Sequence, residues 1–288
     1  MQPARIGRIA AQVALAVVVA VAIVVAIVYG LSEYQLRRSY DVPLEAVAVP
    51  AGPEALALGR RRAISLGCFD GCHGLDALGG QWLDEPRLAL ITAPNLTEIL
   101  PTYSDAELAR LLRYGVRRDG TTAIDMPSYM FYHLSEADLG SVIAFMRTLK
   151  TQPGLVRQRE FGWLGRWALA TGKWTTSVAD VDRDAPAAGA QPLDTAAARG
   201  RYVAMITCPE CHGPALEGFP GDTPPLTIIA AYSFGEFSTL MRTGVGKGGR
   251  DLKLMSMIGR TRTPQLTDQE VADLYAFLRS RLAADGQT

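Results

Sequence analysis

The four cysteines of this 288-residue chain lie in two short runs, and each run ends in a histidine. Residues 68–73 read C-F-D-G-C-H, and residues 208–212 read C-P-E-C-H. No cysteine lies outside these runs, so none remains for a disulfide framework or for a free nucleophilic thiol. The fold must therefore accommodate two Cys/His sites that lie far apart in the sequence.

The spacing within each run suits covalent attachment of haem. Two thiols one helical turn apart can each form a thioether with one haem vinyl group, and the next histidine can then bind the iron. We expect two haem c groups, attached through Cys68, Cys72, Cys208 and Cys211, with His73 and His212 as iron ligands. The alternative is one structural zinc site shared between the runs. Each run lies in its own repeat, however, and a shared zinc would not need the further ligand that each repeat offers.

Residues 59–150 and 199–283 align as an internal repeat, which sets the domain count. Gly59 and Gly200 open short helical stretches that end at the first cysteine, and Pro-x-Leu-Thr or Pro-Pro-Leu-Thr follows each run. A helix in each copy should begin at a capping box and end at a glycine. These residues are Ser104, Glu107 and Gly115 in one copy, and Ser233, Glu236 and Gly244 in the other.

A last helix is predicted in both copies, from Ser135 and from Thr267. Its apolar residues recur at helical spacing, and neither copy shows a strongly alternating segment. The repeat therefore predicts two compact all-α domains of about 90 residues.

The order of helices, haem motif, Pro-x-Leu loop and methionine loop resembles class I c-type cytochromes in tandem. The resemblance covers about two thirds of the chain and implies a methionine as the sixth iron ligand. In the first copy this is Met126, followed by a proline as in the family pattern. In the second copy the family loop length selects Met255, with Met257 as the alternative.

Two features of the first copy depart from the simple pattern. Its haem motif has one extra residue, and Gly71 is expected to absorb it in a conformation forbidden to other residues. His133 is the only histidine outside the motifs, and as a sixth ligand it would make the first haem bis-histidine. Its position at a helix start favours a surface or capping role.

The N-terminal segment contains 20 residues, 9–28, whose only polar member is Gln12. This length would span the hydrocarbon of a bilayer, although a cleaved signal peptide is the alternative. Arginines flank the run on both sides, so charge does not orient it. In the family that the motifs resemble, haem is attached outside the bacterial inner membrane. We therefore expect a single-pass anchor in that membrane with the haem domains in the periplasm.

The expected organisation follows from these features. Residues 1–30 form a cytoplasmic stub and anchor, 31–55 a tether, and 56–150 the first haem domain. Residues 151–198 are an interdomain linker, 199–283 the second haem domain, and 284–288 a tail. The linker is aromatic and basic near Trp163, Trp167 and Trp174, so it could lie at the membrane interface or pack on a haem domain or a partner subunit. The resemblance to multihaem cytochrome subunits of membrane dehydrogenases favours packing on protein. The stretch 184–192 is expected to be flexible.

Net charge is zero, with 29 basic and 29 acidic residues, and this gives no support for nucleic-acid binding. A basic stretch between Arg242 and Arg262 borders the second proposed ligand and could steer an acidic redox partner.

Haem with both axial positions filled offers no open site for a small-molecule substrate. The resemblance thus implies single-electron transfer between a membrane donor complex and an acceptor, not catalysis. The alternatives are a dihaem enzyme such as a peroxidase, or the cytochrome subunit of a substrate dehydrogenase.

Overall fold

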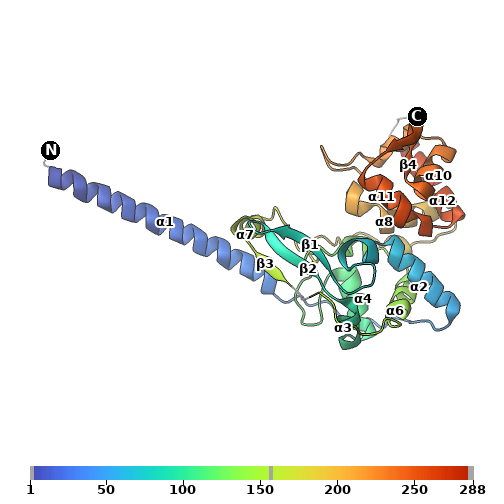
Figure 1. Cartoon of the computed structure of the whole chain (residues 1–288), viewed down its shortest axis with the longest axis horizontal. Coiled ribbons are helices and arrows are strands. Elements are labelled where there is room, and N and C mark those ends of the chain that lie inside the picture. The colour runs from blue at the N-terminus through green and yellow to red at the C-terminus, as the bar shows by residue number, and fades with distance from the viewer. Residues whose placement is uncertain (1–2, 156–157, 285–288) are drawn as a thin grey trace.

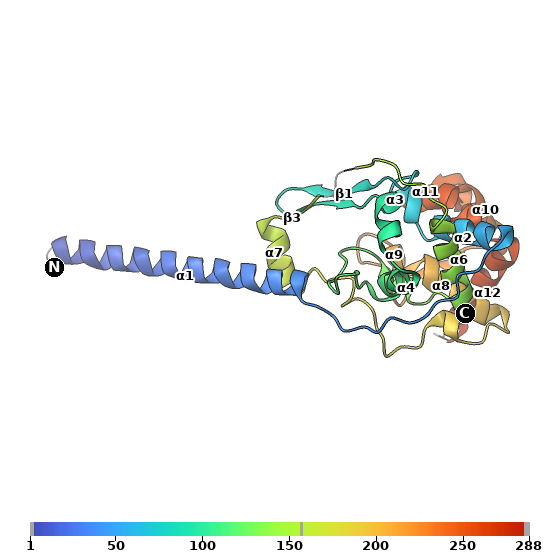
Figure 2. The ribbon, with the colours of Figure 1, turned by 90° about the horizontal axis from the view of Figure 1, so that it is seen from below.

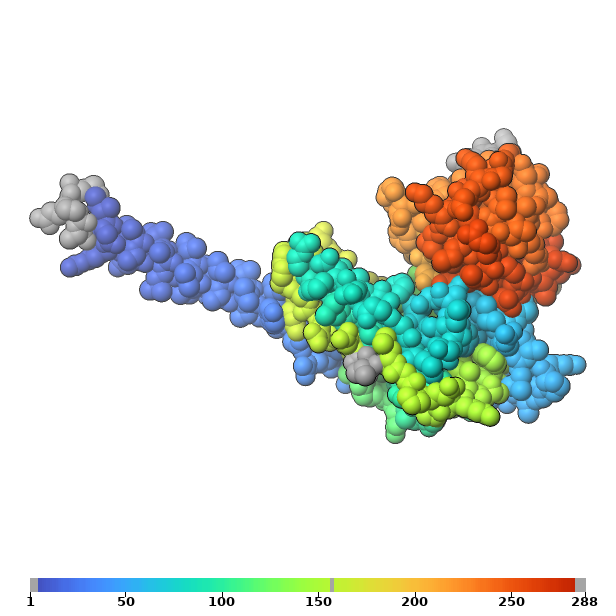
Figure 3. Space-filling model, in the orientation of Figure 1, coloured from blue at the N-terminus to red at the C-terminus, as the bar shows by residue number. Residues whose placement is uncertain are grey.

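The computed structural model describes residues 3–155 and 158–284, so the predicted tail, 284–288, lies outside the described residues except for Ala284. The described chain is rich in helices, and a long helix projects from a body of two lobes (Figures 1 and 3). Residues 50–150 form most of one lobe and residues 195–284 form the other. The predicted repeat thus corresponds to two helical units.

The first unit is built on two crossing helices, α2 (Pro53–Ser65) and α6 (Glu136–Met146), which lie side by side in both ribbon views (Figures 1 and 2). Shorter helices complete it: α3 (Leu96–Ile99), α4 (Asp105–Tyr114) and α5 (Ser128–Phe131). The second unit pairs α8 (Ala196–Thr207) with α12 (Asp268–Ala284). Its remaining helices are α9 (Pro209–His212), α10 (Phe234–Thr243) and α11 (Leu254–Thr261).

The α2–α6 pair and the α8–α12 pair each cross at a glycine, and the two glycines occupy the same position of the repeat. A Cβ added at Gly59 would lie 1.9 Å from the Ser141 carbonyl oxygen, and one added at Gly200 would lie 1.9 Å from that of Asp273. Only glycine permits backbones to approach so closely. The predicted capping boxes and left-handed glycine ends of α4 and α10 are confirmed as well.

The first unit also contains a small antiparallel sheet that the all-α prediction did not include. Strands β1 (Gly80–Glu85), β2 (Ala89–Ala93) and β3 (Arg159–Phe161) pair in that order, with Gly80 opposite Ala93 and Ala89 opposite Phe161. A two-residue pair, β4 (Val245–Gly246) and β5 (Arg250–Asp251), lies in the second unit. The side chains of β1 do not alternate cleanly between buried and exposed, so this segment has no period-2 pattern of apolar residues.

Helix α1 (Pro3–Arg37) is long and apolar enough over Arg5–Arg37 to cross a membrane, and its apolar window is not buried by the rest of the chain. Its last turns contact α7 (Trp163–Ala170). Arg166 ion-pairs with Glu33 at 2.8 Å and lies over the Tyr29 ring at 4.4 Å. These contacts fix α1 to the first unit.

The segments expected to be a tether and a linker pack against the first unit. Val42 is buried with Val116 and Val178, and Tyr40 donates its backbone N–H to the Gly120 carbonyl at 2.9 Å. Strand β3 extends the sheet. The stretch expected to be flexible includes the 3₁₀ turn η3 (Ala188–Ala190), which contacts His133.

His133 is buried, contrary to the expected surface role, because η3 covers it. The Ala188 N–H donates to its Nδ1 at 3.0 Å, and the Gly189 N–H donates to its carbonyl at 2.9 Å. Burial, assisted by the charge of Arg201, lowers the pKa of His133 to about 4. The ring therefore joins the connecting segment to the first unit as a neutral acceptor.

A buried charge cluster joins the two units. Arg62 ion-pairs with Asp138 at 2.8 Å within its own unit and with Glu270 at 2.6 Å in the other. The Tyr202 hydroxyl donates to the same Asp138 carboxylate. One hydrophobic core continues through both units around this cluster. Removing one partner of such a buried network usually destabilises strongly.

The Gly200→Ala variant should lose about 2 kcal/mol of unfolding free energy, because its Cβ would press on a backbone carbonyl that cannot move freely. Urea unfolding of the detergent-solubilised chain measures the loss. Gly235→Ala is the matched control, since nothing lies within 4 Å of a Cβ added near the start of α10. Equal stability of the two variants would contradict the close crossing.

Stability should fall as pH decreases from about 6.5 to about 4, because the unfolded chain protonates His133 before the folded chain does. The contribution of His133 to the free energy of unfolding is fully present above pH 6.5 and amounts to about 3 kcal/mol at most. In His133→Asn the side-chain oxygen can accept the Ala188 N–H without titrating. The urea midpoint of this variant should therefore change less between pH 4 and pH 7 than that of the unaltered chain. An equal change in both proteins would show that His133 does not cause the pH dependence.

Candidate haem sites

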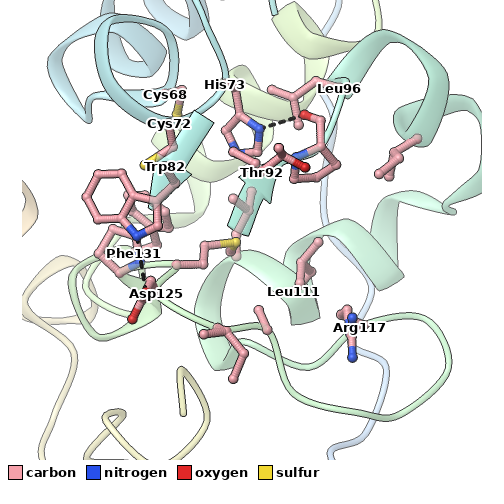
Figure 4. A pocket seen from close by; sticks show the side chains of 18 of the residues that line it. Cys68, Cys72, His73, Trp82, Thr92, Leu96, Leu111, Arg117, Asp125 and Phe131 are labelled. Atoms are coloured by element: carbon pink, nitrogen blue, oxygen red, sulfur yellow. Dashed lines mark hydrogen bonds between the residues drawn. The ribbon is translucent and has the colours of Figure 1, made fainter. Parts of the chain in front are cut away.

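A cavity of about 190 Å³ lies in the first unit beside its Cys/His run. The lining is mainly apolar and includes Cys68, Cys72, His73 and Met126, so the structure brings all four predicted residues of this site to one cavity. Figure 4 shows Cys68, Cys72 and His73 along the upper part of the cavity, Trp82 directly beside the cysteines, and Phe131 and Asp125 below them. Apolar walls around two thiols and an imidazole suit a haem, whose macrocycle is itself apolar.

Each motif histidine makes the same hydrogen bond. Nδ1 of His73 lies 2.9 Å from the Pro94 carbonyl oxygen, and Nδ1 of His212 lies 2.8 Å from that of Pro224. A carbonyl can only accept, so Nδ1 must carry the hydrogen and Nε2 the lone pair. Burial lowers the pKa of both histidines and keeps them neutral. In both rings Nε2 therefore carries the lone pair that a metal ligand needs.

The surrounding loops are also equivalent. Gly74 and Gly213 take positive φ directly after the histidines, and so do Ala77 and Leu216 four residues after them. The His73 carbonyl accepts from Gly79, and the His212 carbonyl accepts from Gly218. A non-glycine residue at positive φ is uncommon, so its recurrence at the same repeat position indicates one shared loop design.

Burial keeps the thiols of both runs protonated. It raises the pKa of Cys68 and Cys72 to about 12, and that of Cys208 to about 11. It also raises the pKa of Cys211. Buried neutral thiols of this kind are inert until they meet a reactive group, and a haem vinyl group is such a group.

The extra residue of the first run is not accommodated as the sequence suggested. Residues Cys68–Cys72 form a π-helical turn, η1, which absorbs one residue relative to an α-helical turn. Gly71 has no positive φ, whereas Gly67, just before the turn, does at 78°. At Gly71 a Cβ would lie 3.0 Å from Nη2 of Arg262, so the guanidinium packs closely against this position.

Asp125 holds the loop that carries Met126, and sequence analysis missed this role. Its carboxylate accepts from Trp82 Nε1 at 3.1 Å and from Trp174 Nε1 at 2.8 Å, and burial raises its pKa. The Met126 N–H donates to Ser177 Oγ at 3.1 Å. Two of these partners lie in the predicted linker, so that segment helps to position the proposed ligand.

Met255 in the second unit lies on helix α11, not in an open loop, and is half-buried against the core. Met257 is 38% exposed. Burial thus favours Met255 of the two candidates. His133 has its Nδ1 engaged with Ala188, and it does not line the cavity of the first unit.

A shared zinc site is not assembled. Within residues 3–155 and 158–284, no group of three or more His, Cys, Asp or Glu side chains converges as metal ligands would. A structural zinc needs four.

The basic stretch is only partly a free surface. Arg262 is buried between the units, and Arg242 ion-pairs with Asp268 at 2.6 Å. Lys247, Arg250 and Lys253 are exposed beside α11. Arg260 on α11 is exposed as well, and Lys247 lies 3.5 Å from the Glu236 carboxylate. We refer to Lys247, Arg250 and Lys253 as the basic face.

Residues 197–281 match the family model of cytochrome c. Two curated relatives carry the description alcohol dehydrogenase (quinone), cytochrome c subunit, from Gluconacetobacter polyoxogenes and Komagataeibacter europaeus. Each is 30% identical over 159 residues, which cover 51% of this chain and 32% of the relative. The chain thus spans about a third of the length of these relatives. Residues 197–281 are a cytochrome c domain, which implies covalently bound haem c.

Proposed function

We propose that the chain is a membrane-anchored dihaem cytochrome c that relays single electrons. The observation that carries the proposal is the repeated hydrogen bond from a motif histidine to a proline carbonyl. It occurs in the matched second unit and equally in the first, which also has a cavity beside its thiols. Both units are therefore class I cytochrome c domains in this proposal, each with one haem c.

Haem held by histidine and methionine supplies reversible one-electron oxidation and reduction of its iron, at a relatively high potential. Cys68 and Cys72 would attach the first group, and Cys208 and Cys211 the second. His73 and His212 offer Nε2 to the iron, while Met126 and Met255 would complete the coordination. Such closed coordination leaves no substrate position, which favours a relay over a peroxidase.

The first helix supports a membrane location. Its contact with α7 lies at Tyr29 and Glu33, directly after the apolar run. Trp163 on α7 is 63% exposed and Trp167 is also exposed. Tryptophan gathers where hydrocarbon meets water. We infer a single-pass anchor in the bacterial inner membrane with both units in the periplasm, and α7 at the membrane surface.

The relatives favour a place in a larger complex. Because they are described as cytochrome subunits of a quinone-dependent alcohol dehydrogenase, we propose a membrane dehydrogenase or respiratory complex as donor or acceptor. The surface of the second unit suits a further soluble partner. Leu254 and Met257 on α11 are exposed and follow Lys253 closely in the chain. Exposed apolar side chains near charged ones are typical of docking surfaces.

Met126→Ala and Met255→Ala should each convert one haem to a high-spin or misligated form and leave the other low-spin. Optical and electron paramagnetic resonance spectra of the oxidised protein measure this, together with the far-red methionine–iron band. Met257→Ala is the control and should leave both haems normal. High-spin haem in the unaltered protein would instead indicate an open site and hence an enzyme.

Replacing Lys247, Arg250 and Lys253 with glutamate should slow electron transfer to an acidic redox protein by about tenfold at low salt and flatten its dependence on ionic strength. The bimolecular rate against salt measures the effect. The control carries the same change of charge at three exposed residues elsewhere, Arg87, Lys150 and Lys173. Equal salt dependence of both variants would show that the basic face does not dock the partner.

A further inference from the structure

Arg262 of the second unit lies between the two Cys/His runs. Its Nε is 2.7 Å from Oδ1 of Asp70 in the first run, and its Nη1 is 2.5 Å from Oε2 of Glu210 in the second. The Arg262 side chain is only 11% exposed, and that of Asp70 is 8% exposed. The hydroxyl of Thr261 donates to the other oxygen of Asp70 at 2.6 Å.

The two acidic residues occupy the same position of the repeat. Asp70 follows Cys68 by two residues, and Glu210 follows Cys208 by two residues. The second interdomain arginine, Arg62, shows the same pattern, since Asp138 and Glu270 stand at equivalent places in the capping segments of α6 and α12. Interfaces in which equivalent surfaces meet are isologous, as in two-fold dimers. The two units are therefore related locally by a pseudo-two-fold axis, and their Cys/His runs face each other across it. We call these two runs the attachment runs.

The first run is shaped to admit the guanidinium. A Cβ at Gly67 would lie 2.3 Å from Cζ of Arg262, and one at Gly71 would lie 3.0 Å from Nη2. Glu210 also lines the cavity of the first unit, although it belongs to the motif of the second. The charge of Arg262 thus stands close to both attachment runs.

We propose that Arg262 is a positioning residue shared by both haem sites, which holds the two attachment runs against each other and sets the two reduction potentials together. This rests on the proposed function in so far as both runs carry haem. Arginine suits the role because it stays charged and its planar fork can engage two carboxylates at once. The triad of one cation and two carboxylates carries one net negative charge.

The sign of each charge change follows from electrostatics. Arg262→Gln leaves two negative charges between the sites, which stabilise oxidised iron and lower both potentials. Asp70→Asn and Glu210→Gln leave no net charge and should raise them. A single charge about 10 Å away inside a protein changes an equilibrium by on the order of tenfold. Each variant should therefore move the equilibrium constants for reduction of both haems by about that factor.

The test is a spectroelectrochemical titration at pH 8 of the detergent-solubilised chain, after its mass has shown the haem content. Arg262→Gln should lower both potentials, Asp70→Asn and Glu210→Gln should raise them, and Arg262→Lys should restore most of the charge effect. Arg260→Gln is the control, because this arginine is exposed and its contact with Asp251 is long, at 3.9 Å. If Arg262 had only a structural role, the potentials would not shift in opposite directions when the arginine and when a carboxylate is neutralised.

The outcomes separate the two proposals. Two haems per chain with opposite shifts at both sites would support a shared role. If the chain carries two haems but the variants shift only one potential, or none, the role of Arg262 is wrong and the dihaem proposal stands. If Arg262→Gln does not fold, the carboxylate variants decide by the same criterion. A single haem per chain would overturn both proposals.

Discussion

The hydrogen bond between each motif histidine and a proline carbonyl is the contact on which both sites depend. It selects the ring tautomer and fixes the plane of the imidazole, because the carbonyl can only accept. The proline must return to the histidine across a loop, and the positive-φ glycines Gly74 and Gly213 begin that return. In the second unit the 3₁₀ turn η4 (Leu226–Ala231), which follows the loop, packs on α12, one of the two helices that cross at Gly200. A cofactor site of this kind therefore needs the whole unit, not only the five- or six-residue motif.

The join between the units is polar at its centre. Arg62 and Arg262 each connect equivalent acidic residues of the two repeats, while the apolar core continues around them. Buried ion pairs contribute less to stability than apolar packing, and their best-supported use is to fix one arrangement among several. Here they would fix which faces of two similar domains meet, and those faces carry the attachment runs.

Much of each unit could be predicted because its signals are local. The capping boxes of α4 and α10, their glycine ends and the helical segments flanking each motif all lie within a few residues of one another. The sheet was missed because β1 lacks clean alternation, and β3 pairs with β2 from a segment far along the chain. The packing of residues 38–52 and 158–190 on the first unit depends on tertiary contacts that composition does not encode. Arg262 was interpreted only as the end of the basic stretch that begins at Arg242, although the acidic residues at the same position of both motifs, Asp70 and Glu210, pointed to a shared partner.

The central claim is that both units, and not only the one that matches the cytochrome c family, hold haem covalently. The most direct test is the mass of the denatured chain after expression with haem-attachment machinery, followed by mapping of the proteolytic peptides. The account predicts an excess of two haems over the apoprotein, with one on the peptide containing Cys68 and Cys72 and one on the peptide containing Cys208 and Cys211. A single haem, with Cys68 and Cys72 recovered as unmodified thiols, would contradict it.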